Sequence, residues 1–428
     1  MAAKLNQESS LSVPFLTKWN QRDEEAAVNS HAPSTKQVSF FKTCINGLNA
    51  LSGVGILSIP YALASGGWLS LILLFGIAIT AFYTGLLMKK CMDMNSDIRS
   101  YPDIGEQAFG KKGRMVISVS MYTELYLVAT GFLILEGDNL NNMFPNMELE
   151  LAGFAIGGKQ FFVILIGLVI VPSVWLDDLS LLSFVSASGV FASGIILCSI
   201  FWAAEIDKGI GFHKQGNLLN WSGIPTAVSL YAFCYCAHPV FPTLYTSMRN
   251  KHQFSNVLLV CFVVSTIGYA SMAIFGYLMF GSEVHSQITL DLPTSKISSR
   301  VAIYTTLVNP ISKYALMVTP IKNALKGLLP QQCKKNKLTN ILISTTLVIS
   351  TVIVALVVPF FGYLMSLVGA FLSITASIIL PCSCYLKISG TYKNFGGELV
   401  AIVGIIIGGV VIAIFGTYTS VVDIVDHL

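Results

Sequence analysis

The chain has 428 residues, of which 54% are hydrophobic and only 11% are charged. Soluble proteins carry about 25% charged residues, so this composition excludes the two or three soluble domains that the length alone would suggest. The 26 basic and 22 acidic residues leave a net charge of +4, which is too small for a phosphate-binding surface and excludes a nucleic-acid-binding protein.

A polar segment opens the chain. Residues 1 to about 38 are rich in Ser, Asn, Gln, Glu and Lys, and no apolar stretch precedes a small-residue cleavage site. We therefore expect a disordered cytosolic tail without a cleavable signal peptide.

Eleven stretches of about 20 residues follow, each almost free of charge and long enough to cross a hydrocarbon core of about 30 Å. They predict membrane spans at Phe40–Ala64, Trp68–Met92, Arg114–Phe144, Phe161–Trp175, Leu179–Ala204, Ile224–Met248, Asn256–Phe280, Val301–Leu328, Leu338–Pro359, Phe361–Leu386 and Glu398–Val422. The predicted fold class is an all-α integral membrane protein of about eleven transmembrane helices.

The nine cysteines lie mostly in or beside these stretches, where a thiol acts as a small hydrophobic group. The pairs Cys234/Cys236 and Cys382/Cys384 lack nearby His and carboxylate ligands at metal-binding spacing. We expect no disulfide framework, no metal site and no cofactor.

The distribution of Lys and Arg predicts the orientation, because basic residues accumulate in cytoplasmic loops. With the N-terminus in the cytoplasm, 20 of the 26 basic residues lie in cytoplasmic segments, 5 lie on the opposite side and one, Lys313, lies within a span. An odd number of spans then places the C-terminus in a lumen or outside the cell.

Two spans contain residues that interrupt a helix near the middle of the membrane. The first carries Gly53, Gly55 and Pro60, and the sixth carries Pro239 and Pro242 after Phe233-Cys234-Tyr235-Cys236-Ala237-His238. Glycine weakens a helix and proline removes one of its hydrogen bonds. Either interruption alone is also a common kink or packing feature. Together, five spans apart, they predict a transporter with an inverted repeat of five plus five spans.

Unwound backbone within a bilayer must face protein or a cavity, so we expect a substrate site between the two breaks. Free amides near Val54–Ile56 suit a carboxylate, and carbonyls on either side suit an ammonium group, so a zwitterion fits both ends. The predicted substrate-binding residues of the breaks are Leu51, Ser52, Gly53, Val54, Gly55, Ile56, Phe233, Cys234, Tyr235 and Cys236.

Four motifs stand out along the chain. They are the first span over Thr43–Ala62, Ser100-Tyr101-Pro102-Asp103-Ile104-Gly105 in the first cytoplasmic loop, Ala237-His238-Pro239-Val240-Phe241-Pro242 in the sixth span, and Asn309-Pro310-Ile311-Ser312-Lys313-Tyr314-Ala315-Leu316 in the eighth. Together they resemble the amino acid/auxin permease family, and specifically its plant vacuolar amino-acid transporter branch, from about Phe40 to the C-terminus.

The resemblance implies a LeuT-type fold of eleven helices with broken first and sixth helices, amino-acid substrates, proton coupling and a place in the vacuolar membrane, with the plasma membrane as the alternative. On that fold we expect a tail at 1–38, a first repeat at 39–204, a second repeat at 205–388, and an eleventh helix with the C-terminus at 389–428. Substrate identity stays open, because members range from carriers of neutral amino acids to carriers of auxin.

Ionisable residues inside the spans are candidates for function, because burying one costs at least about 2.5–3.5 kcal/mol. Lys313 lies near the middle of the eighth span, and Asn309 and Ser312 belong to the same polar stripe. In the resembling fold this span runs beside the first-span break, where sodium-coupled relatives hold a cation. We hypothesise that the Lys313 ammonium occupies that position and carries the coupled proton. The alternative is a permanently charged structural lysine.

The third and sixth spans add further candidates. Glu124 is a candidate proton relay, or else the partner of a basic group. Tyr122 and Tyr126 flank it, and either could contact the substrate, as the third-span tyrosine does in related folds, or pack as an aromatic residue. His238 is a candidate gating or pH-sensing residue, with bonding to freed carbonyls as the alternative.

These features predict a secondary active transporter that moves amino acids by proton-coupled alternating access. An amino-acid-sensing membrane protein and a carrier for another small carboxylate such as auxin are the alternatives. A channel would favour rings of charge, and nothing in the chain matches a nucleophile elbow or a two-His metal pair, so we expect no enzyme. The expected partners are amino acids, protons and the lipid bilayer, with no nucleic acid. Oligomeric state, symport or antiport, and flux direction are left open.

Overall fold

The computed structural model describes residues 38–145, 147, 149–151, 154–175, 182–206, 211–212, 216–330 and 336–427. The predicted tail lies outside these ranges except for Val38, and so does the beginning of the fifth predicted span, 179–181.

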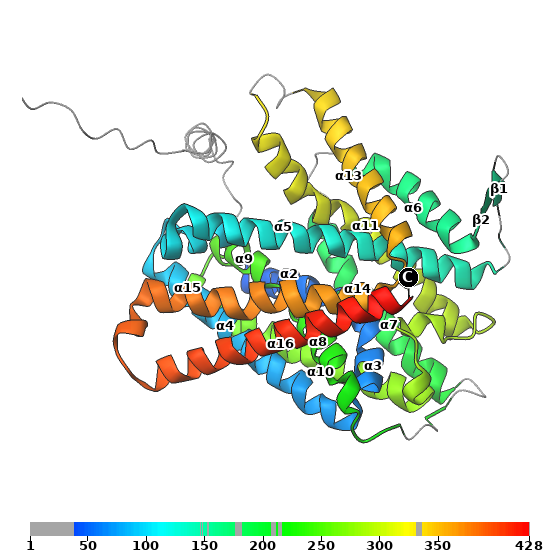
Figure 1. The fold of residues 1–428 in the computed structure, drawn as a ribbon, viewed down its shortest axis with the longest axis horizontal. Coiled ribbons are helices and arrows are strands. Elements are labelled where there is room, and N and C mark those ends of the chain that lie inside the picture. The colour runs from blue at the N-terminus through cyan, green and yellow to red at the C-terminus, as the bar shows by residue number, and fades with distance from the viewer. Residues whose placement is uncertain are drawn as a thin grey trace, which may run out of the picture.

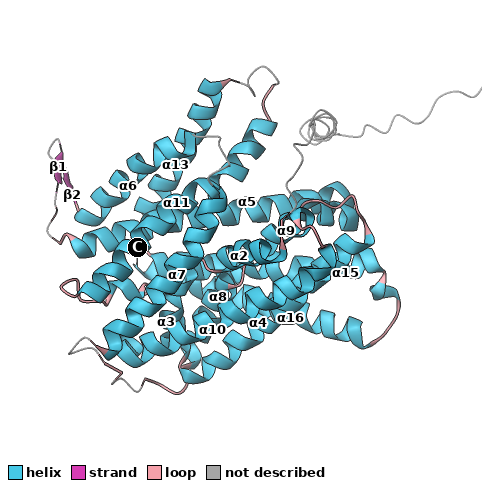
Figure 2. Cartoon of the chain, turned by 180° about the vertical axis from the view of Figure 1, so that it is seen from behind, coloured by secondary structure: helices cyan, strands magenta, loops and turns pink. Residues whose placement is uncertain are grey.

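Helices make up nearly all regular structure in the described part (Figure 2). They are α2 (Phe40–Leu51), α3 (Gly55–Gly66), α4 (Leu71–Met94), α5 (Tyr101–Met143), α6 (Gly158–Trp175), α7 (Leu182–Glu205), α8 (Ile224–Cys234), α9 (Phe241–Ser247), α10 (Phe254–Phe280), α11 (Ile297–Gly327), α13 (Lys337–Val357), α14 (Phe361–Leu367), α15 (Leu380–Ser389) and α16 (Gly397–His427). Strands β1 (Leu149–Leu151) and β2 (Phe154–Ile156) form an antiparallel hairpin that projects from the bundle between α5 and α6 (Figure 1).

Every predicted span coincides with one of these helices or with a joined pair. Within the described residues, nine segments are long and apolar enough to cross a membrane, and α2 with α3, which meet at 51°, make a tenth. The remaining predicted span, Val301–Leu328, overlaps α11, which is 31 residues long but is not among these ten segments. It packs against α5, α7 and α13, and Lys313 is buried there.

Both predicted breaks are present. In the first span, α2 ends at Leu51 and α3 begins at Gly55. In the sixth, α8 ends at Cys234, and a single 3-10 turn over His238–Val240 precedes α9. The half-helix α3 packs on both α8 and α10, so the two breaks belong to one central cluster of helices.

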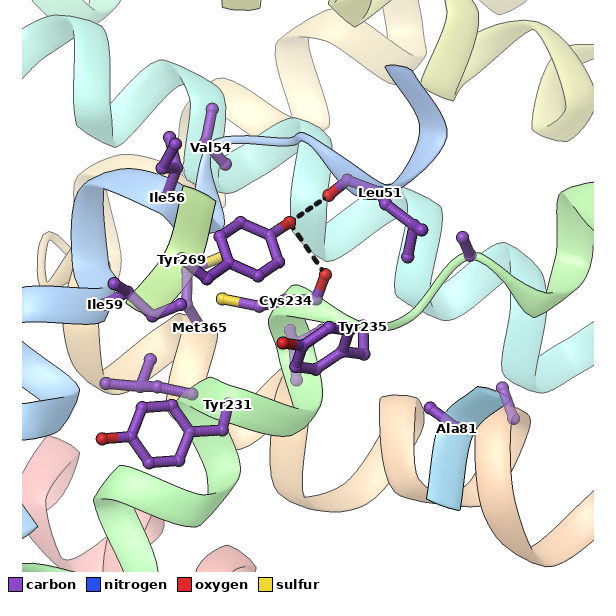
Figure 3. Packing of buried hydrophobic residues seen from close by; sticks show 14 of the residues in the cluster. Leu51, Val54, Ile56, Ile59, Ala81, Tyr231, Cys234, Tyr235, Tyr269 and Met365 are labelled. Atoms are coloured by element: carbon purple, nitrogen blue, oxygen red, sulfur yellow. Dashed lines mark hydrogen bonds between the residues drawn. The ribbon is translucent and has the colours of Figure 1, made fainter. Parts of the chain in front are cut away.

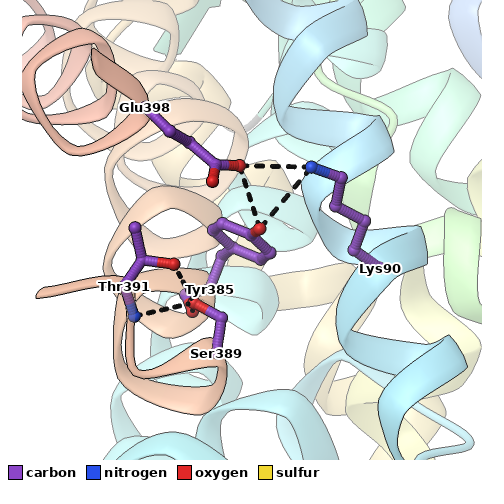
Figure 4. A network of polar contacts seen from close by, with 5 residues as sticks. All are labelled: Lys90, Tyr385, Ser389, Thr391 and Glu398. Atoms are coloured by element: carbon purple, nitrogen blue, oxygen red, sulfur yellow. Dashed lines mark hydrogen bonds and ion pairs between the residues drawn. The ribbon is translucent and has the colours of Figure 1, made fainter. Parts of the chain in front are cut away.

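The bundle has two ends, which we name by the chain. The N-terminal face is the end at which α2 begins and α4, α9 and α11 finish, and the opposite face is the end at which α3, α5 and α10 finish. At the N-terminal face, Lys90 Nζ of α4 lies 3.2 Å from Glu398 Oε1 of α16, and the Tyr385 hydroxyl donates to the same carboxylate at 3.0 Å (Figure 4). The Lys90 and Glu398 side chains are half exposed, so the pair contributes at most about 1 kcal/mol.

The tenth span departs from a regular α-helix. Between α14 and α15 the turns widen into π-helix over Val368–Ser373 and Thr375–Ile379. Such wide turns are rare and often occur at functional sites. Gly369 lies here, where a Cβ atom would stand 1.9 Å from the Ser229 carbonyl oxygen of α8. The close approach of the tenth span to the sixth therefore requires glycine at this position.

We predict that Gly369→Ala destabilises the protein by about 1–3 kcal/mol, because the added methyl group must push the tenth span away from α8. Thermal unfolding of the purified protein in detergent checks this as a lowered melting temperature. The matched control is Gly404→Ala, at an exposed α16 position with open space around it. Alanine favours a helix at position 404, so we expect no lowering of the melting temperature in this control. An equal decrease of the melting temperature in both variants would contradict the packing argument.

Candidate functional site

A cavity of about 1210 Å³ reaches both helix breaks. Its wall includes residues of the N-terminal face, such as Lys42, Ser100 and Arg114, and residues deep in the bundle, such as Glu124 and Lys313. No residue of the opposite face belongs to the described wall. The cavity is therefore accessible from one side only.

The first-span break presents free amides to this cavity. The Gly53 N–H donates to the Leu51 carbonyl at 2.8 Å, and the Ile56 N–H makes a long bond of 3.4 Å to Gly53. The Val54 and Gly55 amides donate to no acceptor among the described residues, and both residues line the cavity. Because these amides begin the 12-residue helix α3, the positive end of its dipole faces the cavity and suits an anion.

Tyr269 of α10 joins the two breaks. Its hydroxyl lies within hydrogen-bonding distance of the Leu51 carbonyl, where α2 ends, and 3.1 Å from the Cys234 carbonyl, where α8 ends (Figure 3). Two carbonyls that the sequence suggests for an ammonium group therefore already have a partner. Neither the breaks nor the hydropathy pattern indicated Tyr269, because its role depends on how α10 packs.

The Cys236 carbonyl is the acceptor that the sixth-span break leaves open. It accepts no hydrogen bond from the described residues, because Pro239, three residues further along, has no N–H to donate. Cys236 also lines the cavity. The arrangement thus offers two free donors on one break and one free acceptor on the other.

The cavity brings together most, but not all, of the predicted substrate residues. Its wall includes Leu51, Gly53, Val54, Gly55, Tyr122, Phe233, Cys234 and Cys236. Ser52, Ile56, Tyr126 and Tyr235 are not part of it. Tyr235 points away, since its ring stacks on Phe262 and its hydroxyl donates to Thr266 at 2.9 Å.

Lys313 reaches the first-span break from α11. The residue is 4% exposed, and Nζ donates to the Ser52 carbonyl at 3.1 Å. The α7 backbone packs closely here, since a Cβ on Gly189 would stand 3.0 Å from Lys313 Cε and 2.0 Å from Asn49 Oδ1. The ammonium thus lies at the carbonyl end of α2, where a positive charge is favoured.

The other two residues of the predicted stripe are also in α11. Asn309 lies one turn before Lys313, on the same side of the helix. The side chain of Ser312 lies outside the described residues.

Glu124 of α5 connects the third, sixth and tenth spans. It is 6% exposed and lines the cavity. The Ser373 hydroxyl of the π-helical segment donates to Oε1 at 2.6 Å, and the Ser377 hydroxyl donates to the Cys236 sulfur at 3.2 Å. No described basic side chain forms an ion pair with Glu124. The sequence patterns considered above do not point to Ser373 or to its neighbour Ser377, although two serines four residues apart in an apolar span lie on one side of a helix.

His238 lies outside the cavity wall. The residue is fully buried, and Nε2 lies 2.9 Å from Thr84 Oγ1 and 3.1 Å from the Ala81 carbonyl oxygen, both in α4. The imidazole therefore connects the second half of the sixth span to α4 by hydrogen bonds.

The sequence of this chain is similar to those of known amino acid transporters. Residues 36–422 match a protein-family model described as transmembrane amino acid transporter protein. The amino acid transporters AVT1I and AVT1J of Arabidopsis thaliana are each 59% identical, over 91% and 97% of this chain and 96% and 97% of their own. The vesicular GABA transporter of Caenorhabditis elegans is 27% identical over 94% of this chain and 83% of its own.

A solved structure of a sodium-coupled sialic acid symporter in its outward-open state superposes with a TM-score of 0.53 at 12% identity, covering 95% of this chain and 94% of its own. That likeness concerns the fold, and it agrees with the predicted LeuT-type architecture with its broken first and sixth helices. The named relatives are transporters and not enzymes. On the extent of the family match and the identity to its members, the chain belongs to the transmembrane amino acid transporter family.

Proposed function

We propose that the protein is a secondary active transporter that moves amino acids across the vacuolar membrane by proton-coupled alternating access. The observation that carries the proposal is the one-sided cavity that ends at the two helix breaks. A transporter of this type exposes one central site to one side of the membrane at a time.

Closure of the opposite face supports alternating access. After α3, the Trp68 and Leu69 N–H groups donate to the Asn217 and Leu218 carbonyls at 3.1 and 3.0 Å. The Trp68 ring packs against Tyr277 at 5.0 Å between centroids. The path from the breaks to that face is therefore filled by packed and hydrogen-bonded residues.

In the proposed binding mode the α-carboxylate accepts from the Val54 and Gly55 amides. The α-ammonium donates to the Cys236 carbonyl, and the Glu124 carboxylate belongs to the same cavity wall. The substrate side chain lies against Tyr122, Phe233 and their neighbours in the cavity wall. A simple carboxylate such as auxin would leave the acceptor end unused, which favours amino acids.

Proton coupling is assigned to Lys313, with Glu124 as a second proton carrier. A protonated Lys313 provides a cation at the Ser52 carbonyl, where a bound metal cation would otherwise balance the carbonyl end of α2. A neutral Lys313 amine would not provide this positive charge, so the protonation state of Lys313 and the geometry of the first break are linked.

The orientation follows the positive-inside rule. The N-terminal face, with most of the Lys and Arg residues, faces the cytoplasm in this proposal, and the C-terminus lies in the lumen. Helices within 39–204 and 205–388 form the two repeats, and α16 belongs to the additional segment 389–428. The vacuolar assignment rests on the resemblance to the vacuolar branch.

We predict that the protein in liposomes accumulates amino acids against a concentration gradient when a pH gradient is imposed. One coupled proton sustains about a tenfold accumulation per pH unit. The measurement is uptake of a panel of labelled amino acids into vesicles of defined protein orientation, with the pH gradient applied in each direction. Saturable binding without flux in either direction would instead identify an amino-acid sensor.

We predict that Lys313→Ala loses proton-driven uptake but retains exchange of amino acids at equal pH, because exchange needs the site and not the coupled proton. Gly189→Ala is a companion variant that keeps the amine but adds a methyl group against both Asn49 and the Lys313 side chain, so we expect a weaker form of the same defect. An unaltered pH dependence of uptake in Lys313→Ala would remove this residue from the coupling mechanism.

We predict that His238→Gln lowers thermal stability by about 1–3 kcal/mol and leaves the pH profile of uptake unchanged. The substitution disturbs a buried hydrogen-bonded group, and the imidazole is enclosed away from the cavity. Parallel unfolding and uptake measurements test this. A shifted pH optimum at wild-type stability would restore His238 as a pH sensor.

A further inference from the structure

A polar network closes the face opposite the cavity mouth. Asn139 Nδ2 of α5 donates to Gln287 Oε1 at 2.9 Å, and Gln287 Nε2 donates to Asp138 Oδ2 at 2.7 Å. Asp138 also pairs with Lys159 of α6, whose Nζ donates to the Pro359 carbonyl at 2.5 Å. We call Asp138, Asn139, Lys159 and Gln287 the opposite-face seal.

Glu136 lies beneath this seal, one turn before Asn139 and nearer the middle of α5. The residue is 0% exposed, and neither carboxylate oxygen has a hydrogen-bond partner among the described residues. An ionised carboxylate at such a site would lose its hydration without any compensating bond. The surroundings therefore suit the neutral, protonated acid.

The charged and titratable groups on the elements around this part of α5 have other partners or lie at the surface. Asp138 and Lys159 pair with each other, and so do His285 and Asp291 of the loop before α11. On α11, Arg300 Nε donates to the Thr294 carbonyl, Lys313 to the Ser52 carbonyl, and Tyr314 is bonded to Thr351 of α13. Glu283 is exposed, and Tyr363 of α14 is bonded to His427. None of these groups supplies a counter-charge to Glu136.

The geometry points to a role in the cycle: we propose that Glu136 is a proton-binding residue, which holds a proton in this conformation and releases it to water at the opposite face when the seal opens. This inference rests on the proposed transport function. In the step, one proton moves from a carboxyl oxygen of Glu136 to water, and the carboxylate becomes solvated.

The seal is mechanically connected to the substrate site. The turn Ile288–Leu290, directly after Gln287, packs on α3, α5 and α11. Contact with α3 is close, since a Cβ on Gly276 of α10 would stand 2.5 Å from Pro60 and 2.7 Å from Ile288. Because α3 begins at the proposed carboxylate site, a shift of α3 on substrate binding or release moves Gln287 relative to Asn139.

Glu136 and Lys313 lie toward opposite faces of the bundle, and only Lys313 lines the open cavity. Lys313 lines the cavity that is open to the N-terminal face, whereas Glu136 is separated from the opposite face by the seal. If the opposite face opened and the N-terminal face closed, Glu136 would become accessible to water and Lys313 would not. The two residues therefore report on different halves of the transport cycle.

The first test measures the proton directly. Infrared spectra of the full-length protein in membranes at neutral pH should contain a C=O stretching band of a protonated carboxylic acid that disappears in Glu136→Gln. The matched control is Glu398→Gln, at a half-exposed carboxylate of the N-terminal face, which should leave the band unchanged. No difference between wild type and Glu136→Gln would overturn the proposal.

The second test measures coupling in liposomes with a labelled mixture of the twenty amino acids. In Glu136→Gln we expect accumulation to fall about tenfold for each pH unit of gradient, while exchange at equal pH continues. Accumulation equal to that of wild type would contradict the proposal. The amide of Glu136→Gln has the size and neutrality of the protonated acid, so this variant should fold. If Glu136→Gln did not fold while Glu136→Asp did, that result would also contradict the proposal.

The two tests separate this inference from the function on which it rests. If the wild-type protein accumulates no amino acid under any gradient, the transport proposal fails and the role of Glu136 in a cycle fails with it. The infrared comparison still decides whether Glu136 is protonated. If wild type accumulates amino acids and the band is absent, only the inference about Glu136 is overturned.

Discussion

Two interrupted helices expose backbone N–H and C=O groups in the interior of a bilayer, where no water is available to satisfy them. The rest of the bundle is arranged around this requirement. Tyr269 bonds the carbonyl ends of α2 and α8 with a single hydroxyl, and Lys313 bonds the carbonyl of Ser52. After these partners are supplied, the Val54 and Gly55 amides and the Cys236 carbonyl have no partner among the described residues, and all three residues line the cavity. The candidate site consists of the backbone groups that the protein itself does not satisfy.

Close backbone approaches hold the two breaks together. A Cβ on Gly55 would stand 2.7 Å from the Cys234 sulfur, and one on Gly369 would meet the Ser229 carbonyl oxygen. Glycine at these positions lets the first, sixth and tenth spans pack without intervening side chains. Because van der Waals contacts are short-ranged, these close approaches keep the two breaks next to each other.

The spans and both breaks could be read from the sequence, because hydropathy and the conformational limits of glycine and proline are local properties. The side-chain directions within the breaks could not. Helical periodicity places Tyr122 and Tyr126 on one side of α5, yet only Tyr122 reaches the cavity wall. Tyr235 lies in unwound chain, which has no fixed periodicity, and its ring turns toward Phe262.

Composition and local pattern are enough to predict a membrane protein of about eleven spans, with two broken helices and a lysine within the eighth span. Which groups meet depends on the packing of the helices. Tyr269 reaches two carbonyls, Ser373 reaches Glu124, and Asn139 reaches Gln287. These contacts join residues far apart in the chain. They depend on how helices rotate and pack against one another, and hydropathy carries no information about that.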